Sequence, residues 1–481
     1  MKVGLIDPDT PQEALTKQAY TPGRSEELIL VFSDEFNVDG RTFYPGDDPY
    51  WEAVDLHYWG TNDLEWYDPS GATTEGGSLR LTLSRANPEN NHNMNYTSGM
   101  VQTWNKFCFT GGLLEAAVRL PGNTNAAGLW PAVWAMGNLG RAGFGGSLDG
   151  MVCCLPDMAD SYSDVPKFSG RTVTTRATSE PFPTRRTPEL NFPNWRSPWA
   201  TLRETMCSPT FQARNSVSCQ CVLILWIALM GPPTPQAACT CPGESHPGPM
   251  RPDGSYVGRA APEIDVIEAL VENGVGQVSL SAQWAPYNAG YNWTVNSQTY
   301  AIHDPDRVHL NAYKGGVYQQ TSSALGITNQ DCYEEGGTDC FAVYGFEYKP
   351  GFEDGYITWI NDDTAAWTIL SQGMGSDPLT HIGARPIPQE PMYIIANLGF
   401  SLNFGPIDFD ILHLPATMSV DYIRVYQPKD AVNIGCDPIE FPTAKYIETY
   451  NRAYTNPNIS TWEQMEEPWP KNRLANGGTC D

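Results

Sequence analysis

The chain has 481 residues, a formal net charge of −26, 44 glycines, 40 prolines and 11% aromatic residues. The acidic balance argues against nucleic-acid binding, because contact with phosphates needs a basic surface. Abundant glycine, proline and aromatic residues, with only 17% charged residues, favour a turn-rich β protein over a helical one.

The N-terminal segment 1–27 begins with MKVGLIDPDT, which lacks the apolar stretch of a signal peptide. The sequence has no run of about 18 apolar residues, so it predicts no transmembrane helix. Sequons for N-glycosylation at Asn95, Asn292 and Asn458, together with twelve cysteines, favour an oxidising, lumenal or extracellular compartment. We therefore interpret residues 1–27 as the remnant of a longer N-terminus whose membrane anchor is missing from this chain.

Strand-like runs fill two stretches of the chain, residues 28–150 and residues 262–430. LILVFSDEF, SLRLTLS, QVSLSAQWAP, FAVYGFEY and MSVDYIRVYQ are short, alternating or apolar, and turn residues separate them. Few long helices are indicated. The pattern predicts an all-β sandwich of two antiparallel sheets with long loop insertions, spanning residues 28–430.

Residues 151–237 interrupt this pattern with a segment rich in Pro, Thr, Ser and Arg. One interpretation is a long surface insertion. The other is a stretch that is not native coding sequence, such as a retained intron or a frame error, and the abrupt change of composition at both edges favours it. The polar and aromatic residues 431–481 are predicted to form a tail that wraps the domain surface.

The cysteines suggest disulfides but not their pairing. Cys332 and Cys340 flank an acidic loop, and Cys436 and Cys480 bracket the C-terminal tail, so both pairs are candidates. No metalloprotease, phosphate-loop or dinucleotide motif is present, and we expect neither a metal nor a cofactor.

The stretch APEIDVIEAL crowds three carboxylates, Glu263, Asp265 and Glu268, between apolar residues. On a strand, Glu263 and Asp265 share a face, and one extra residue in a β-bulge would return Glu268 to that face. Two carboxyl groups about 5–5.5 Å apart suit a retaining glycosidase, in which one is the nucleophile and the other the acid/base.

The alternative for this stretch is an amphipathic helix or a solvated acidic face. Pro262 would suit the first turn of such a helix, and the acids would suit its N-terminus. The Asn-Gly turn in VENGVG and the returning strand QVSLSAQWAP favour a hairpin instead.

Aromatic residues accompany the acids. Trp130 and Trp134 in GLWPAVWAMGN, Asn62 in NDLEWY, and Trp284 after the acidic segment are candidates for sugar binding, because indoles stack on sugar rings and amides bond hydroxyls. Core packing is the alternative for any single tryptophan. Fifteen tryptophans are more than a core of this size needs, so some are expected to line a cleft.

Several motifs in order resemble a known family. EIDVIE resembles the E-x-D-x-x-E signature of the laminarinase-type family 16 glycoside hydrolases, and GLWPAVW resembles their cleft motif. GRTFYPGDDPYWEAVDLHYWGTNDLEWYDP, SGMVQTWNKFCFTGG and ACTCPGE are similar to the fungal β-1,6-glucan synthesis-associated proteins. The resemblance covers residues 26–150 and 238–481. It implies a concanavalin-like β-jelly-roll with a glucan-binding cleft.

The resemblance also implies roles and a location. Glu263 would be the nucleophile, Asp265 its helper and Glu268 the acid/base, with the aromatic candidates lining sugar subsites. The expected function is a retaining β-glucan glycosidase or transglycosylase in cell-wall β-1,6-glucan biosynthesis, at membranes of the secretory pathway with a lumenal catalytic domain. A catalytically weak glucan-binding or scaffold protein is the alternative. The expected partner is β-glucan, not nucleic acid.

Overall fold

The computed structural model describes residues 4–149, 236–288, 290–316, 319–380, 382–473 and 479–480. The atypical segment predicted at 151–237 lies outside the described residues except for its last two positions. Neither interpretation of that segment is tested by the fold.

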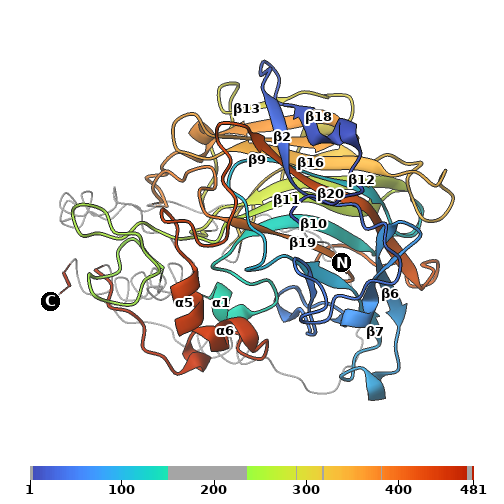
Figure 1. The fold of residues 1–481 in the computed structure, drawn as a ribbon, viewed down its shortest axis with the longest axis horizontal. Coiled ribbons are helices and arrows are strands. Elements are labelled where there is room, and N and C mark those ends of the chain that lie inside the picture. Colours follow the sequence, from blue (N-terminus) through green and yellow to red (C-terminus); the bar gives the residue numbers. More distant parts are fainter. Residues whose placement is uncertain are drawn as a thin grey trace, which may run out of the picture. The chain divides into compact units, whose positions relative to one another are not determined.

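Two sheets form a sandwich in the larger compact unit of the chain (Figure 1). Their strands pair antiparallel except for one short parallel pair, β4 with β7. The fold is therefore the predicted all-β jelly-roll sandwich. The 12-stranded sheet runs β13 (Tyr300–Ile302), β18 (Thr364–Leu370), β17 (Tyr356–Asn361), β16 (Ala342–Lys349), β9 (Gly112–Arg119), β20 (Ala416–Pro428), β6 (Ser78–Arg85), β7 (Tyr96–Ser98) and β4 (Glu65–Tyr67), joined by β1 (Thr16–Gln18), β2 (Glu27–Asp34) and β5 (Ala72–Glu75).

The second sheet carries the acidic segment. Its eight strands run β14 (Val308–Leu310), β15 (Thr321–Ile327), β12 (Val275–Gln283), β11 (Glu263–Glu272), β10 (Trp130–Gly137), β19 (Met392–Gly399), β8 (Met100–Gln102) and β3 (Glu52–Ala53). The described helices are short: α1 (Gly145–Leu148), α5 (Ala444–Thr449), α6 (Asn451–Thr455), η1 (Gln12–Leu15), η2 (Trp59–Thr61), η3 (Pro69–Gly71), η4 (Pro88–Asn90), η6 (Ser371–Met374) and η7 (Glu463–Met465).

The main hydrophobic core lies between the sheets. Period-two alternation sends one set of side chains inward from each strand. On β10, Val133 and Ala135 enter this core, whereas Trp134 belongs to a separate cluster on the other face of the sheet. The outer face of the eight-stranded sheet is therefore free to present side chains to a cleft.

The N-terminal segment is attached to the 12-stranded sheet. Residues 16–18 form β1, which pairs with β2. Lys17 makes an ion pair with the buried Glu115, and Thr21 donates its hydroxyl proton to the buried Glu347 at 2.6 Å. The N-terminal segment thus supplies the ion-pair partner of Glu115 and a hydrogen-bond donor to Glu347.

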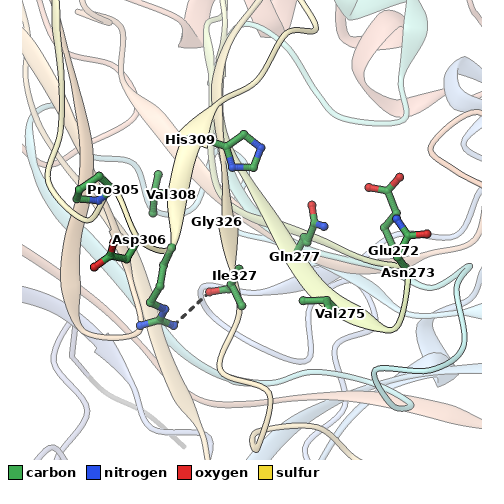
Figure 2. Close-up of a pocket in the computed structure, with 11 residues that line it drawn as sticks. Glu272, Asn273, Val275, Gln277, Pro305, Asp306, Val308, His309, Gly326 and Ile327 are labelled. Atoms are coloured by element: carbon green, nitrogen blue, oxygen red, sulfur yellow. Dashed lines mark hydrogen bonds between the residues drawn. The ribbon is translucent and has the colours of Figure 1, made fainter.

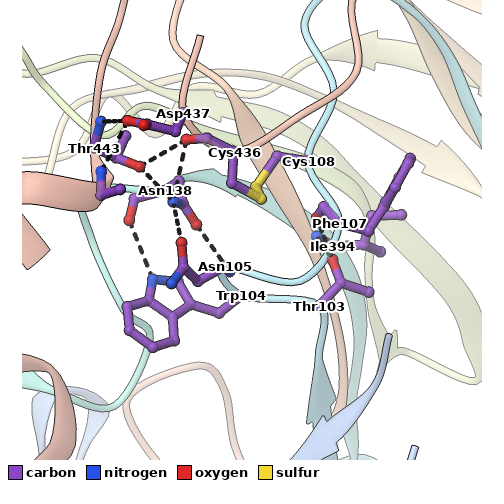
Figure 3. Close-up of a disulfide and its surroundings, with 11 residues drawn as sticks. Thr103, Trp104, Asn105, Phe107, Cys108, Asn138, Ile394, Cys436, Asp437 and Thr443 are labelled. Atoms are coloured by element: carbon purple, nitrogen blue, oxygen red, sulfur yellow. Dashed lines mark hydrogen bonds between the residues drawn. A yellow bond between two sulfur atoms is a disulfide. The ribbon is translucent and has the colours of Figure 1, made fainter. Parts of the chain in front are cut away.

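The C-terminal segment is held against the end of β10. The helices α1, α5 and α6 lie together beside the sheets (Figure 1). The fully buried Asn138 donates from its amide to Thr443 at 3.0 Å and accepts from the backbone amide of Asn105 at 3.0 Å (Figure 3). The disulfide Cys108–Cys436 joins the same two regions.

Three disulfides occur among the described residues, and they correct one predicted pairing. Cys332 pairs with Cys340 as expected. Cys436 and Cys480 do not pair with each other, because Cys436 bonds Cys108 and Cys480 bonds Cys241. Spacing in the chain could not reveal partners that are 328 and 239 residues away.

The described part of the chain has no helix of the length and apolar character needed to cross a membrane. Its acidic and histidine or cysteine side chains also form no group of three or more that could hold a metal ion.

Candidate active site

The acidic segment is a strand with one extra residue. On one side, β11 advances from Ile264 to Glu268 while its partner β12 moves only from Ala282 to Ser279. On the other side, the partners of Val133 and Trp134 on β10 are Ile267 and Asp265, which skips Val266. The pairing of β11 with both neighbouring strands therefore contains a β-bulge, which confirms the prediction from the sequence. The alternative interpretation of this segment as an amphipathic helix is wrong.

The bulge places all three acids on the outer face. Glu263, Asp265 and Glu268 line the same cleft. Ile264, Val266 and Ile267 are fully buried in the core between the sheets. The one-residue insertion reverses the alternation, so that two consecutive apolar residues point inward and Glu268 returns to the outer face.

A tryptophan from the opposite sheet holds the bulge. The indole N–H of Trp359 on β17 donates to the backbone carbonyl of Asp265 at 2.9 Å. The Trp359 ring is fully buried and stacks on Trp367 with centroids 4.5 Å apart. A bulge disrupts the ladder of backbone bonds, and this indole satisfies a carbonyl at the disrupted position.

The carboxylates share hydrogen-bond partners on neighbouring strands. Ser281 on β12 has its hydroxyl oxygen 2.6 Å from Asp265 Oδ2 and 3.3 Å from Glu268 Oε2. A hydroxyl has one proton, so Ser281 donates to one carboxyl at a time. Trp130 donates its indole N–H to Glu268 Oε1 at 3.1 Å and stacks on Phe404.

Burial raises the pKa of all three carboxyl groups. Burial, with the neighbouring charge of Glu268, raises the pKa of Glu263 to about 8. Burial also raises the pKa of Glu268 to about 7, and the pKa of Asp265 lies well above its usual value for the same reason. Three crowded carboxyls cannot all ionise at neutral pH, so the cluster retains a proton that an acid step can use.

The cleft around the acids has a volume of about 1100 Å³. It crosses β10, β11, β12 and β15 on the outer face of the eight-stranded sheet. Its aromatic lining consists of Tyr58, Tyr67, Trp130, Trp134, Tyr287, Tyr313 and Phe404. Carboxylates and amides on the floor can bond hydroxyls, while the aromatic rings can pack on apolar sugar faces.

Two of the four predicted sugar-binding residues lie in the cleft and two do not. Trp130 and Trp134 line it. Trp284 is 3% exposed and belongs to the core between the sheets, because it follows β12 on the inward side. Asn62 is exposed at the end of η2 in a left-handed conformation, outside the cleft lining, whereas its neighbour Asp63 lines the cleft.

Sequence reasoning missed a chain of hydrogen bonds that supports Trp134. Its indole N–H donates to Asn397 Oδ1 at 2.8 Å, the Asn397 amide donates to the Tyr67 hydroxyl at 3.0 Å, and Tyr67 donates to Asp63 at 3.3 Å. A lone asparagine within the apolar strand MYIIANLG was the available signal for this chain.

Ser281 was also missed, although the sequence contains a signal for it. Ser279, Ser281 and Gln283 recur at every second position of β12 and all line the cleft. A polar row with period two, opposite the acidic strand of a hairpin, marks the face that the two strands share.

The three sequon asparagines, Asn95, Asn292 and Asn458, are all exposed. Their side chains are therefore accessible to modification in the folded chain.

A β-jelly-roll with clustered carboxylates in an aromatic cleft is the class of protein that the sequence predicted. The family model for the beta-glucan synthesis-associated proteins SKN1/KRE6/Sbg1 matches residues 1–480, and the chain belongs to this family. It is similar to beta-glucan synthesis-associated protein SKN1 of Candida albicans, with 39% identity over 475 residues, covering 98% of this chain and 55% of the relative. Beta-glucan synthesis-associated protein KRE6 of Saccharomyces cerevisiae is 38% identical over 483 residues, covering 100% of this chain and 57% of the relative.

The chain thus spans about half the length of the curated relatives it matches. Among solved structures, it is similar to an endo-beta-1,3-glucanase from Pyrococcus furiosus at 17% identity and a TM-score of 0.43. That match covers 86% of this chain and 98% of the glucanase chain.

Proposed function

We propose that the protein is a retaining β-glucan glycosidase or transglycosylase that acts in cell-wall β-1,6-glucan biosynthesis. The observation that carries the proposal is the bulge in β11, which gathers Glu263, Asp265 and Glu268 on the floor of one aromatic-lined cleft. Membership of a family of beta-glucan synthesis-associated proteins supports β-glucan as the substrate class.

In the proposed mechanism, Glu263 attacks the anomeric carbon and Glu268 protonates the leaving oxygen. The bond from the sugar to the leaving oxygen breaks as the Glu263–sugar ester forms. In the second step, Glu268 removes a proton from the incoming hydroxyl, whose oxygen bonds the anomeric carbon as the ester bond to Glu263 breaks and that carboxylate is released. Asp265, close to both, stabilises the ionised Glu263 by hydrogen bonding when it is itself protonated. The raised pKa of Glu268 keeps its proton available near neutral pH.

The acceptor decides between hydrolysis and transfer. A glucan hydroxyl placed beyond the carboxylates would yield a transfer product, and water would yield a shorter chain. The participation of the relatives in beta-glucan synthesis favours transfer. A glucan-binding or scaffold role without turnover is the competing outcome of the experiment below.

Three disulfides and exposed sequon asparagines support a lumenal or extracellular location for this domain. We include in the proposal glycosylation at Asn95, Asn292 and Asn458, and attachment to secretory-pathway membranes through an anchor outside this chain.

The test uses purified protein, β-1,3- and β-1,6-gluco-oligosaccharides, and mass spectrometry of the products. Longer products mean transfer, shorter ones mean hydrolysis, and binding without any product means a scaffold. Replacement of the proposed nucleophile, Glu263→Gln, should reduce turnover by ~10³-fold or more while the fold is retained. Unchanged turnover in a folded variant would show that Glu263 is not the nucleophile.

A further inference from the structure

A second, smaller cavity lies beside one end of the cleft, and Figure 2 shows the residues that line it. It has a volume of about 290 Å³ and shares Glu272, Asn273 and Gln277 with the cleft lining. We call it the side pocket; its remaining lining residues are Val275, Pro305, Asp306, Arg307, Val308, His309, Gly326 and Ile327. The side pocket and the cleft therefore lie on either side of these three residues.

The side pocket lies on the same face of the sheet as the acids. Glu268 pairs with Ser279, Ser279 with Leu325, and Leu325 with His309 on the edge strand β14. Directly paired residues on adjacent strands point to the same side. His309 therefore ends the cross-strand row that contains Glu268, three strand spacings away, or ~14 Å.

The cleft has another extension at the opposite end of these strands. There its lining includes Asn311, Tyr313 and Gln319, beside the start of β15. Tyr313 is 53% exposed, and the Gln319 amide donates to its hydroxyl at 3.0 Å. The side pocket lies beside the other end of β15, and the two ends are ~20 Å apart at about 3.3 Å per residue.

A linear glucan that continues from the carboxylates over Tyr313 would not need to enter the side pocket. Beyond the carboxylates, Tyr313 lies beside one end of β15 and the side pocket beside the other. Two binding spaces at the two ends of β15 suit a branched glucan, whose main chain and branch could occupy one space each.

The chemistry of the side pocket suits a sugar ring. Val275 and Ile327 present exposed apolar surface, which can pack on the apolar face of a pyranose. The side chains of Gln277 and His309 make no hydrogen bond to any described residue, so their donors and acceptors are free for hydroxyl groups. Arg307 is engaged elsewhere, with the Ile327 carbonyl at 3.2 Å (Figure 2) and with Asp362.

We propose that the side pocket binds a glucosyl branch of a β-glucan whose main chain lies in the cleft. This inference rests on the proposed function, because it assumes a glucan in the cleft. It adds that the protein prefers branched over linear substrate and that Gln277 and His309 determine the preference.

The test measures binding to the Glu263→Gln variant, so that no turnover complicates the titration. The probes are linear β-1,3-gluco-oligosaccharides and a series of the same chains, each with a single β-1,6-glucosyl branch at a different residue. The Kd of each probe is measured by calorimetry. Two hydroxyl contacts at about 0.5–1.5 kcal/mol each predict a ~5- to 150-fold lower Kd for the best branched probe. In the His309→Ala/Ile327→Ala background, which changes two residues that line the side pocket and not the cleft, the linear Kd should stay and most of the branch advantage should disappear.

A matched control replaces Gln298, which is exposed and lines neither space, with alanine; it should keep the full branch advantage. The inference is overturned if no branched probe binds more tightly, or if the double variant weakens linear and branched probes alike. It is also overturned if a longer linear chain gains the same affinity and loses it in the double variant. If no probe of either kind binds, the proposed function itself fails, and this inference fails with it.

Discussion

Single carboxyl groups in the cleft influence one another through their charges. The ionised Glu268 is a cause, after burial, of the raised pKa of Glu263. In the proposed mechanism Glu263 is the nucleophile and must be ionised, so its raised pKa should limit turnover on the acidic side of the pH profile. The proposed general acid, Glu268, must be protonated; because its pKa of about 7 lies below the pKa of Glu263 at about 8, the form with Glu263 ionised and Glu268 protonated is a minority at every pH.

Replacing Glu268 by glutamine should move the acidic limit to lower pH. The substitution removes a negative charge beside Glu263, which lowers the pKa of Glu263 and leaves it ionised in more acidic solution. The measurement is the pH dependence of kcat/KM with an aryl β-oligoglucoside, whose leaving group needs no proton, in wild type and variant. An acidic limb that stays in place or moves upward would contradict the assigned coupling.

Substitution of Tyr67 would test whether the chain of hydrogen bonds from Trp134 through Asn397 to Tyr67 matters for substrate binding. In Tyr67→Phe the Asn397 amide loses its acceptor, and its orientation toward the Trp134 indole is no longer fixed. Loss of one hydrogen bond, at about 0.5–1.5 kcal/mol, predicts a ~2- to 10-fold rise in KM with little change in kcat. Tyr96→Phe, whose ring packs on Phe400 outside the cleft lining, is the control and should leave KM unchanged.

At the scale of elements, the bulge in β11 depends on support from the opposite sheet. Trp359 and Trp367 are stacked, fully buried, and donate their indole protons across the core to backbone carbonyls. Only the acceptor of Trp359, the carbonyl of Asp265, belongs to the bulge; Trp367 donates to Leu280 on β12.

Both Trp359→Phe and Trp367→Phe should destabilise the fold, but only Trp359→Phe should impair catalysis. Each change leaves a buried carbonyl without its indole donor, which costs about 1–3 kcal/mol in the free energy of unfolding. Trp359→Phe should also lower kcat, by up to ~10²-fold, because small displacements of reacting groups are costly. The measurements are the free energy of unfolding in urea and kcat for both variants. Equal losses of kcat in the two variants would show that the bulge has no special dependence on Trp359.

The elements that could be predicted from sequence are those with local signals. The bulge followed from the spacing of Glu263, Asp265 and Glu268 and from the Asn-Gly turn after them, since one residue decides which face a side chain takes. Trp284 could not be assigned, because an inward and an outward tryptophan look the same until the register of the strand is known. The partners of Cys436 and Cys480 were equally inaccessible, because contacts across more than 200 residues leave no local pattern.

On the scale of the whole molecule, the disulfide Cys108–Cys436 fixes the C-terminal segment to the sandwich. Replacement of both cysteines by serine should lower the free energy of unfolding by about 2–5 kcal/mol, because the bond closes a very long loop in the unfolded chain. Hydrogen exchange should accelerate in α5 and α6, whereas β9 and β20 in the sheet centre should remain protected in the native state. Uniform acceleration throughout the described residues would show that the segment does not open separately.

The order of strands also governs when this protein can fold. The long strand β2, near the start of the chain, lies beside β20, where Leu28 pairs with Pro428. During synthesis on the ribosome, β2 emerges long before its neighbour exists, and its unpaired edge is open to aggregation in the meantime. Completion of the 12-stranded sheet therefore waits for the synthesis of residues 416–428, and nascent chains of this protein should depend on chaperones until β20 has been made.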